Sequence, residues 1–414
     1  MVVEWQEMAI GDVAEVVGGG TPSTKDESNF NGEIPWITPK DLSGYMYRYI
    51  SRGDRNISQK GLQNSSAKIL PKGSVLLTTR APVGYVAISS NPVTTNQGFR
   101  SLILRDGFSP EFCYYLLKSN TDYLKAHASG TTFGELSGST LKGLKFLFPP
   151  LPEQRTIAHI LGTLDDKIEL NRQMNHTLET MAQALFKSWF VDFDSVRDQD
   201  MQDSQMGEIP IGWAYKNVAS TIEINPSRKL SRGVEAIYVD MAALPTSAAR
   251  VSGITTRPYS GSGSRFTNGD VLLARITPCL ENGKTALVDF LPDGDIGWGS
   301  TEFIVLGPKP PIGSYFIYCL ARNPEFRLHA IQAMTGTSGR QRVDPACFNH
   351  YWLAVPEVDT AQKFEQHVKP WFQKMKANDD ESCVLASIRD ALLPKLLSGE
   401  IRVKEAAKIM ENAV

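Results

Sequence analysis

An internal repeat constrains this chain more than any other feature of its sequence. The block KGSVLLTTR at 72–80 resembles NGDVLLARI at 268–276, 196 residues later, and CYYLLKSN at 113–120 resembles FIYCLARN at 316–323, 203 residues later. Two further block pairs follow in the same order, and the spacing grows to 207 residues at the end of each copy. Because self-similarity over such a distance is a property of the fold, we expect two similar modules.

Each module is followed by a stretch with the apolar spacing of one long helix. Alternating steps of four and three residues trace a seam that starts at Ile157, and a matching seam starts 207 residues later at Phe364. The polar breaks coincide, since Asn171 falls on Asn378. Helices that pack on each other need matching seams, whereas two unrelated surface helices, the alternative, do not. We predict an antiparallel coiled coil with the seam residues Ile157, Leu161, Leu164, Ile168, Asn171, Leu178, Leu185, Phe364, Val368, Met375, Asn378, Leu385 and Leu392.

The predicted helices are long enough to act as a spacer. About 38 residues at about 1.5 Å per residue form a rod of roughly 57 Å. The second helix contains Pro370 and Pro394. Because proline lacks the backbone N–H and its ring clashes with the preceding turn, these residues predict a kink and an early stop in that helix.

Helical spacing is sparse inside the modules themselves. Runs such as SVLLTTRAPVGYVAIS are β-branched or aromatic and are punctuated by Gly, Pro and Asn, which predicts short strands and turns. One helix is expected at about 110–127 in the first module and one at about 312–332 in the second. The predicted fold class is α+β, with two similar mixed α/β modules, two long helices and a pseudo-two-fold repeat. The expected segments are a first module at 1–151, a central helix at 152–191, an acidic linker at 192–208, a second module at 209–357, and a C-terminal helix and tail at 358–414.

Composition excludes several classes of protein. With 42% hydrophobic and 21% charged residues, the chain is typical of a globular protein, and it has no run of about 18 apolar residues that could span a membrane. The opening MVVEWQEMAIGDVAEV has acids where a signal peptide has basic residues, so we expect a cytoplasmic protein. The five cysteines are never spaced as CxxC, which predicts free or buried thiols rather than a metal site or a disulfide framework.

Charge is distributed unevenly along the chain. Residues 1–150 carry 15 Lys and Arg against 13 Asp and Glu, and residues 205–357 carry 14 against 13, whereas residues 151–204 carry 5 against 10. The modules are therefore neutral to weakly basic. A strong independent nucleic-acid binder is usually more basic, so any DNA contact here requires local patches or help from partners.

Several motifs, taken in order, resemble those of a known family. GGGTPST, GEIPWITPKDL, TTRAPVGYVAI, TTNQGF and FPPLPEQRTIAHILGTLDDKIELNRQ are followed by a diverged second copy and LLPKLLSGEI. This set resembles the specificity subunit of Type I restriction-modification systems over essentially the whole chain. The resemblance implies two target recognition domains that each read one half of a split, asymmetric DNA target. It also implies two conserved helices that hold these domains apart and dock modification subunits.

The same resemblance implies partners and cofactors. The partners are double-stranded DNA, two modification (methyltransferase) subunits and restriction (translocase and nuclease) subunits, with no membrane. S-adenosylmethionine, ATP and Mg are expected on the partner subunits, which methylate adenine or restrict, and no cofactor is expected on this chain. The second module opens with IEINPSRKLSRGVEAIYVDM where the first is glycine-rich, so the two half-sites are expected to differ.

Physical reasoning also favours a recognition role. Two similar modules on a rigid spacer can bind one long, periodic ligand at two points. DNA offers equivalent docking faces about 34 Å apart, which is within the reach of a rod of roughly 57 Å.

The candidate DNA-contacting residues are polar side chains in the Gly and Pro loops. Arg reads guanine, Gln reads adenine, and Thr and Lys hold phosphates. For each residue the alternative is a solvated loop side chain or an ion pair at a strand end. The loop GTSGRQR at 336–342 is favoured because three long planar donors lie beside glycines that let the backbone approach closely. The candidates are Thr38, Lys40, Arg80, Gln97, Thr131, Thr132, Arg228, Lys229, Arg275, Arg340, Gln341 and Arg342.

The motifs of the rival enzyme classes are missing. FPPL lacks the Asn or Asp that opens the motif of a DNA amino-methyltransferase, and the triple glycine at 18–20 leads into Thr-Pro and a strand rather than a helix. A Walker lysine loop is absent, and the six histidines show no ligand spacing. We therefore predict a non-catalytic chain. The alternatives are a coiled-coil scaffold that binds proteins without DNA and a self-contained DNA-modifying enzyme.

Overall fold

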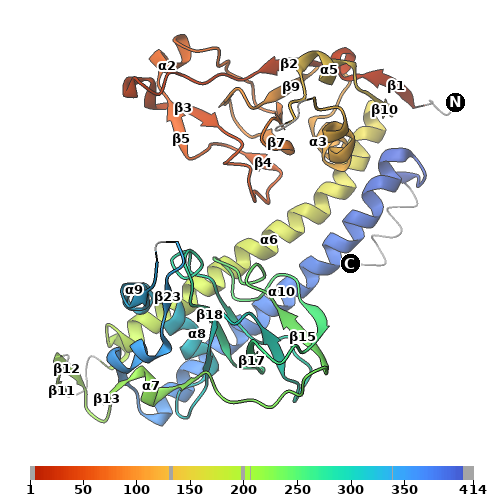
Figure 1. Cartoon of the computed structure of the whole chain (residues 1–414). Coiled ribbons are helices and arrows are strands. Elements are labelled where there is room, and N and C mark those ends of the chain that lie inside the picture. The colour runs from red at the N-terminus through yellow and green to blue at the C-terminus, as the bar shows by residue number, and fades with distance from the viewer. Residues whose placement is uncertain (1–4, 130–133, 197–200, 206, 338, 404–414) are drawn as a thin grey trace. The chain divides into compact units, whose positions relative to one another are not determined.

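The computed structural model describes residues 5–129, 134–196, 201–205, 207–337 and 339–403. The chain divides into two compact units, Met1–Glu169 with Ser382–Val414 and Leu170–Glu381. Each unit contains one module together with part of each long helix, α6 (Leu151–Phe190) and α10 (Val358–Ser398) (Figure 1). A module is therefore packed against segments that lie far apart in the sequence.

The first module is built from short strands and short helices. Its strands are β1 (Gln6–Ala9), β2 (Ala14–Gly18), β3 (Phe30–Ile37), β4 (Tyr49–Ile50), β5 (Arg55–Ile57), β6 (Val75–Thr79), β7 (Val83–Ser89), β8 (Thr94–Thr95), β9 (Arg100–Leu104) and β10 (Lys145–Phe148). Its helices are α1 (Ile10–Val13), the 3-10 helix η1 (Glu27–Asn29), α2 (Gln59–Gln63), α3 (Pro110–Ser119), α4 (Thr121–Ala126) and α5 (Gly138–Gly143).

A five-stranded sheet with the order β2-β9-β6-β7-β4 forms the centre of this module. The central strand β6 is buried on both faces, which explains its uninterrupted apolar run. Val75 and Leu77 enter the core beneath α3, whereas Leu76 points into a second core on the opposite face. The remaining strands form a three-stranded sheet, β5-β3-β8, and the pair β1-β10.

The second module has the same kinds of element. Its strands are β11 (Met201–Ser204), β12 (Gly207–Pro210), β13 (Ala214–Asn217), β14 (Glu223–Ile224), β15 (Glu235–Val239), β16 (Thr255–Pro258), β17 (Ser264–Phe266), β18 (Val271–Ala274), β19 (Thr285–Leu287), β20 (Gly297–Gly299), β21 (Phe303–Gly307), β22 (Met334–Thr335), β23 (Arg342–Val343) and β24 (Trp352–Val355). Its helices are η2 (Asp194–Val196), α7 (Val218–Thr221), α8 (Ser314–Arg322), α9 (Pro324–Gln332) and η3 (Pro345–His350).

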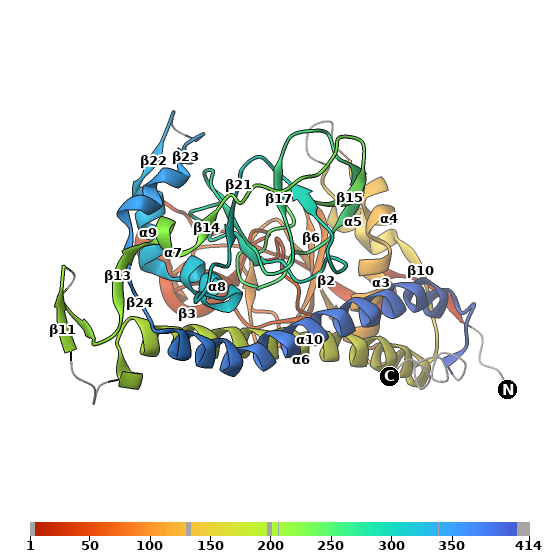
Figure 2. The ribbon, with the colours of Figure 1, turned by 90° about the horizontal axis from the view of Figure 1, so that it is seen from below.

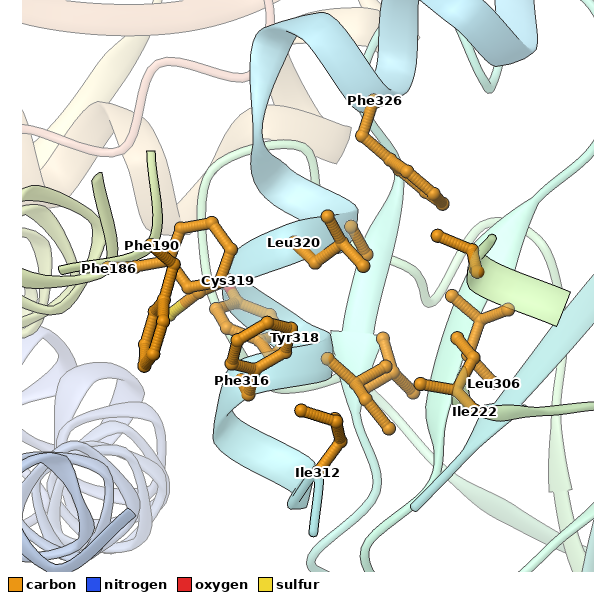
Figure 3. Close-up of a cluster of buried hydrophobic side chains, with 14 of the residues drawn as sticks. Phe186, Phe190, Ile222, Leu306, Ile312, Phe316, Tyr318, Cys319, Leu320 and Phe326 are labelled. Carbon is orange, nitrogen blue, oxygen red and sulfur yellow. The ribbon is translucent and has the colours of Figure 1, made fainter. Parts of the chain in front are cut away.

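The strand order of the second module repeats that of the first. The sheet β14-β21-β18-β19 corresponds to β2-β9-β6-β7, and the pair β13-β24 corresponds to β1-β10. The central strand is again buried on both faces, with Val271 and Leu273 in one core and Leu272 in another. Figure 3 shows Phe186 and Phe190 of α6 in the first of these cores with Phe316 of α8, and the Phe186 and Phe316 rings lie 5.0 Å apart. The sequence repeat is therefore a repeat of topology.

Two expectations about the short helices were wrong. The helix expected at about 110–127 is two helices, α3 and α4, that meet at Asn120, and the one expected at about 312–332 is likewise α8 and α9. In the second pair the side chain of Asn323 accepts hydrogen bonds from the backbone N–H groups of Glu325 and Phe326. This N-cap starts a new helix, because the Asn323 side chain satisfies backbone N–H groups of the first turn of α9 that have no partner within the helix.

The early stop expected at Pro394 was also wrong, because α10 continues through both prolines to Ser398. Pro394 is exposed, and Leu392, Leu396 and Leu397 on either side of it are buried in the first module's core. Tertiary packing of these leucines offsets the missing hydrogen bond. The stretch expected as an acidic linker, 192–208, includes β11 and the start of β12, which pair antiparallel.

The long helices α6 and α10 pack antiparallel (Figure 2). In the first unit Leu164 and Ile168 form a cluster with Leu385, and in the second unit the Phe190 ring lies 5.0 Å from the Phe364 ring. Later residues of α6 thus pack against earlier residues of α10, so the two helices run in opposite directions. The predicted α+β class, with two similar modules and an antiparallel helix pair, is confirmed. Within the described part of the chain, no helix combines the length and apolarity that crossing a membrane requires.

Candidate nucleic-acid interface

The first module brings several candidate residues together where its strands end. The backbone N–H and Oγ1 of Thr38 both donate to Asp41 Oδ2, each at 2.7 Å, and Lys40 Nζ lies 3.1 Å from Asp54 Oδ2. Gln97 accepts a hydrogen bond from the Thr21 hydroxyl. A Cβ on Gly98 would lie 3.0 Å from the Pro39 ring, so the loops after β3 and after β8 are neighbours. Thr131 and Thr132 lie outside the described residues.

Arg80 joins a charged cluster that the sequence did not reveal. Arg80 forms an isolated β-bridge with Glu135, and its Nη1 lies 4.0 Å from Glu135 Oε2. Arg100 Nη2 lies 3.6 Å from Glu135 Oε1. Arg100 was missed because it is the first residue of a buried strand, where side chains usually serve packing. Alternation along β9 places Arg100 on the same face as the fully buried Leu102, so no signal in the sequence marked its side chain as partly exposed.

In the second module the favoured loop connects β22 and β23. Gly336 and Gly339 have φ of 123° and 78°, conformations that favour glycine, and Arg340 is exposed. The backbone of Gln341 is anchored, because its carbonyl accepts a hydrogen bond from Thr277 N at 3.0 Å. Arg340 is therefore exposed, while the backbone of the next residue, Gln341, is held in place by a hydrogen bond.

Arg342 closes this loop through a two-pronged ion pair. Its Nε lies 2.9 Å from each carboxylate oxygen of Glu302, and its Nη2 lies 2.8 Å from Glu302 Oε1. These hydrogen bonds raise the pKa of the Arg342 guanidinium. Arg275 lies beside the pair, since its backbone N donates to the Glu302 carbonyl and its carbonyl accepts from Val343 N. Among the described residues the buried Nε of Arg275 has no hydrogen-bond partner.

Arg228 matches the alternative interpretation, an ion pair that serves the fold. Its Nη2 lies 2.5 Å and 2.6 Å from the two oxygens of Asp270, whose side chain is 1% exposed. Burial raises the pKa of Asp270, and the hydrogen bond from Arg228 opposes this shift. A guanidinium held in this way is already committed to an internal carboxylate. Lys229, the next residue, is exposed.

The predicted seam residues are buried or half-buried along both long helices. At the middle of the pair the seam becomes polar: Asn171 Nδ2 donates to the Asn378 carbonyl at 3.2 Å and to Glu381 Oε2 at 2.7 Å. Asn175 Nδ2 donates to Asp379 Oδ1 at 2.8 Å. Asn171 and Asn378, which are related by the repeat spacing of 207 residues, are in direct contact.

A buried arginine anchors the first module to the helices. Arg48 Nη1 donates to the Tyr115 hydroxyl at 3.0 Å, and Arg48 Nη2 lies 2.6 Å from Asp166 Oδ1 on α6. Tyr115 in turn donates to Asp165 at 2.7 Å, and burial raises the pKa of this phenol. Asp165 also pairs with Arg389 of α10 at 2.6 Å. This network, which the sequence did not reveal, fixes the module on both helices.

The second module is anchored by an equivalent but different set of contacts. Arg250 pairs with Asp289 at 2.8 Å and with Asp380 of α10 at 2.9 Å. Tyr318 donates to Glu179 of α6 at 2.6 Å, and Arg322 Nε lies 3.0 Å from the same carboxylate oxygen. The second module therefore contacts both helices through charged side chains, whereas the first module contacts α6 directly and α10 through Asp165.

Each long helix also carries exposed apolar residues that lie outside the seam. On α6 these include Leu170, at 51% exposure, and Met181, at 43%, and on α10 Val384 is 54% exposed. Seam-like steps of seven, four and three residues connect Leu170, Thr177, Met181 and Ala184, and the residues 207 positions later are Ala377, Val384, Ile388 and Ala391. Ile388 is half-buried and the others are exposed. The two helices thus carry matching strips of small and apolar side chains.

The described residues contain no group of three or more His, Cys, Asp and Glu side chains placed to hold a metal ion.

Comparisons with known proteins agree with this arrangement. Residues 2–180 match the family model described as the Type I restriction modification DNA specificity domain. The chain is 38% identical to the type I restriction enzyme MjaIX specificity subunit of Methanocaldococcus jannaschii over 97% of this chain and 94% of that protein. It is 25% identical to the HindI specificity subunit of Haemophilus influenzae over 96% of this chain and all of that protein. The crystal structure of a Type-I restriction-modification system S subunit from M. genitalium covers 95% of this chain and 96% of its own with a TM-score of 0.58, and at 17% identity it shows the fold alone.

Proposed function

The chain belongs to the specificity subunits of type I restriction enzymes, and we propose that it reads a bipartite, asymmetric DNA target with one half-site per module. The observation that carries this proposal is the repeated topology with different loop chemistry. The same sheet supports an Arg80, Arg100 and Glu135 cluster in one module and an Arg340 and Arg342 loop in the other. Modules with the same topology can dock on DNA in similar ways, whereas different loop side chains contact different bases.

We further propose that this chain is non-catalytic and directs adenine methylation or restriction by partner subunits. Two modification subunits would bind it, because the matching strips around Leu170 and Met181 on α6 and around Ala377 and Val384 on α10 form two similar surfaces. Exposed apolar side chains in such strips are typical of helices that accept a partner helix. The charged side chains that pair the modules with α6 and α10 would keep their partners within this chain and would not contact the modification subunits.

The chemistry of the complex is assigned to those partners. S-adenosylmethionine would be held by the modification subunits, and ATP and Mg by restriction subunits. These groups would supply the methyl group and the energy for restriction. This chain's own residues would bind DNA, orient it and hold the partner subunits.

Methylation mapping tests the proposal. Genomic DNA from cells that carry this chain with its modification subunits is expected to show methylated adenines in one split sequence with a fixed gap. Deleting the chain should abolish that pattern while the modification subunits are still made. A methylation pattern that persists without this chain would contradict the assignment.

Stoichiometry tests the two docking surfaces. Native mass spectrometry of the assembled complex is expected to show two modification subunits for each copy of this chain. Replacing Met181 with Glu should remove one of them, because a charge in the apolar strip opposes helix packing, while Thr180→Glu, its exposed neighbour, serves as the control. Saturation at one modification subunit in the unaltered protein would contradict two equivalent surfaces.

A further inference from the structure

Each module pairs one carboxylate with arginine side chains of its candidate DNA surface. In the first module Glu135 lies 3.6 Å from Arg100 and 4.0 Å from Arg80. In the second module Glu302 holds both prongs of the Arg342 guanidinium, at 2.8 Å to 2.9 Å. Both carboxylates are partly exposed, with side-chain exposures of 40% and 22%. They belong to the candidate DNA surface rather than to a core.

The residue at the equivalent loop position carries opposite charge in the two modules. Arg80 forms its β-bridge with Glu135, and Ile276 forms the corresponding bridge with Arg342, at the spacings of 196 and 207 residues that the repeat shows. The loop therefore carries the carboxylate in the first module and the guanidinium in the second. A backbone conformation that required one particular residue type at this loop position cannot explain both pairs, because the position holds Glu in one module and Arg in the other. What the modules have in common is a guanidinium beside a carboxylate.

A contribution to stability does not explain these pairs either. An exposed ion pair stabilises a fold by only about 0–1 kcal/mol. On a DNA-binding surface, in contrast, the carboxylate affects the binding of every duplex because it cancels a positive charge and repels phosphate. Non-specific binding rests almost entirely on that positive charge. Guanine offers two acceptors, O6 and N7, that match the guanidinium fork and can take the place of the two carboxylate oxygens.

We propose that Glu135 and Glu302 are specificity-determining residues that mask the recognition arginines until bases of the target sequence displace them. The proposal rests on the proposed function, because it requires the loops to contact DNA. The carboxylates lower affinity for every duplex through repulsion, and only the target sequence compensates for this with base contacts. The result is a larger ratio of specific to non-specific affinity at the expense of absolute affinity.

Glu302→Gln tests the proposal in the full chain assembled with its modification subunits. Glutamine keeps the shape and one acceptor but removes the charge. Affinity for a short random-sequence duplex is expected to rise roughly twofold to fivefold, the range that one exposed ion pair represents. The salt slope is expected to steepen by about 0.9, since one more guanidinium displaces counterions. Affinity for the target duplex is expected to change less, so the specificity ratio falls.

Glu135→Gln is the second, independent variant, and it is expected to shift random-duplex affinity in the same direction because it frees Arg80 and Arg100 together. Glu208→Gln, an exposed carboxylate on β12, makes the same change in net charge and is the control. If both loop variants match this control in random-duplex affinity and salt slope, the masking role is wrong. It is equally wrong if they lose target affinity while random binding stays constant. A wild-type complex that shows no preference for its methylated sequence would instead refute the proposed function itself.

Discussion

Gly162 shows how a side chain from a distant loop can determine one residue of a long helix. Glycine in a helix interior is unfavourable by about 1 kcal/mol relative to alanine. Here a Cβ would lie 2.3 Å from Nη1 of Arg48, so only glycine leaves room for the guanidinium against α6. Arg48 uses that space to reach Tyr115 and Asp166. The conformational penalty in the helix is offset by an anchor for the first module.

Gly162→Ala is therefore expected to destabilise the first unit despite its better helix propensity. The displaced guanidinium would lose two charge-assisted or buried hydrogen bonds, a loss of about 1–3 kcal/mol against a gain of about 1 kcal/mol. Thermal unfolding followed by circular dichroism measures the change. Thr163→Ala, the exposed neighbour on α6, should leave the transition unchanged or raise it. Equal transitions for the two variants would show that Arg48 relocates without loss.

If the second module contacts DNA as proposed, a variant of Arg340 can distinguish a base contact from a phosphate contact. Its side chain is exposed on the β22-β23 loop, whose neighbours Gln341 and Arg342 are anchored. Arg340→Ala is expected to weaken recognition of the second module's half-site and to leave the other half-site and the gap unchanged. A lost bidentate base contact weakens binding by about 1–3 kcal/mol.

Methylation mapping of the Arg340→Ala complex distinguishes the two kinds of contact. A base contact would relax one position of the half-site, whereas a phosphate contact would lower methylation of every sequence evenly. Lys229→Ala, another exposed cation of the same module, provides the comparison. A variant that changed only the gap would show that the loop does not read the half-site.

At the scale of elements, the helix pair is held at three places with different chemistry. Ile157 and Leu161 share the first module's core with Leu392 and Leu396, and Phe186 and Phe190 share the second module's core with Phe364. Between them lies the polar layer of Asn171 and Asn378. Buried amides of this kind fix helix register because a shifted pairing leaves them without partners.

Lengthening both helices by one heptad is expected to lengthen the gap of the target. Seven residues inserted after Gln173 in α6 and after Asp380 in α10 preserve the seam and add about 10.5 Å, or about three base pairs at roughly 3.4 Å per pair. Both half-sites should be kept, and methylation mapping reads the new gap. Lengthening α6 alone is the control, and it should reduce activity because each core contains residues of both helices. A double insertion that changed the bases read would contradict the spacer role.

At the scale of the whole molecule, charge limits what this chain can do alone. The first module region has an excess of two cations and the second an excess of one, and several of those cations are paired with carboxylates. Few counterions can be released when such a surface meets DNA. Affinity must therefore come from additional contacts by the assembled complex.

The isolated chain is accordingly expected to bind its target weakly and with a shallow dependence on salt, whereas the complex with modification subunits binds tightly and with a steeper one. Fluorescence anisotropy of the same labelled duplex across a salt titration measures both slopes. The modification subunits without this chain serve as the control for their own non-specific binding. Equal affinity and equal slope for chain and complex would contradict this view.

The sequence by itself determined the features that repeat or that follow a periodic pattern. The two modules, the matched helices and the polar break at Asn171 and Asn378 were predictable, because a repeat spacing and a heptad are visible without contacts. The β-rich character of the modules followed from β-branched runs between turn residues. Local signals were less reliable at Pro394 and at the α3-α4 and α8-α9 breaks, where distant packing and caps decided the outcome.

Only the tertiary structure decided which charged side chains meet. Arg228 and Arg342 carry the same kind of signal in the sequence, yet one is paired with the buried Asp270 and the other with the partly exposed Glu302. Arg100 and Glu135, and likewise Arg48 and Gly162, are far apart in the chain and are joined only by the fold. The physical reason is that an ion pair depends on distance and burial in space, and neither quantity is encoded in the spacing of residues along one chain.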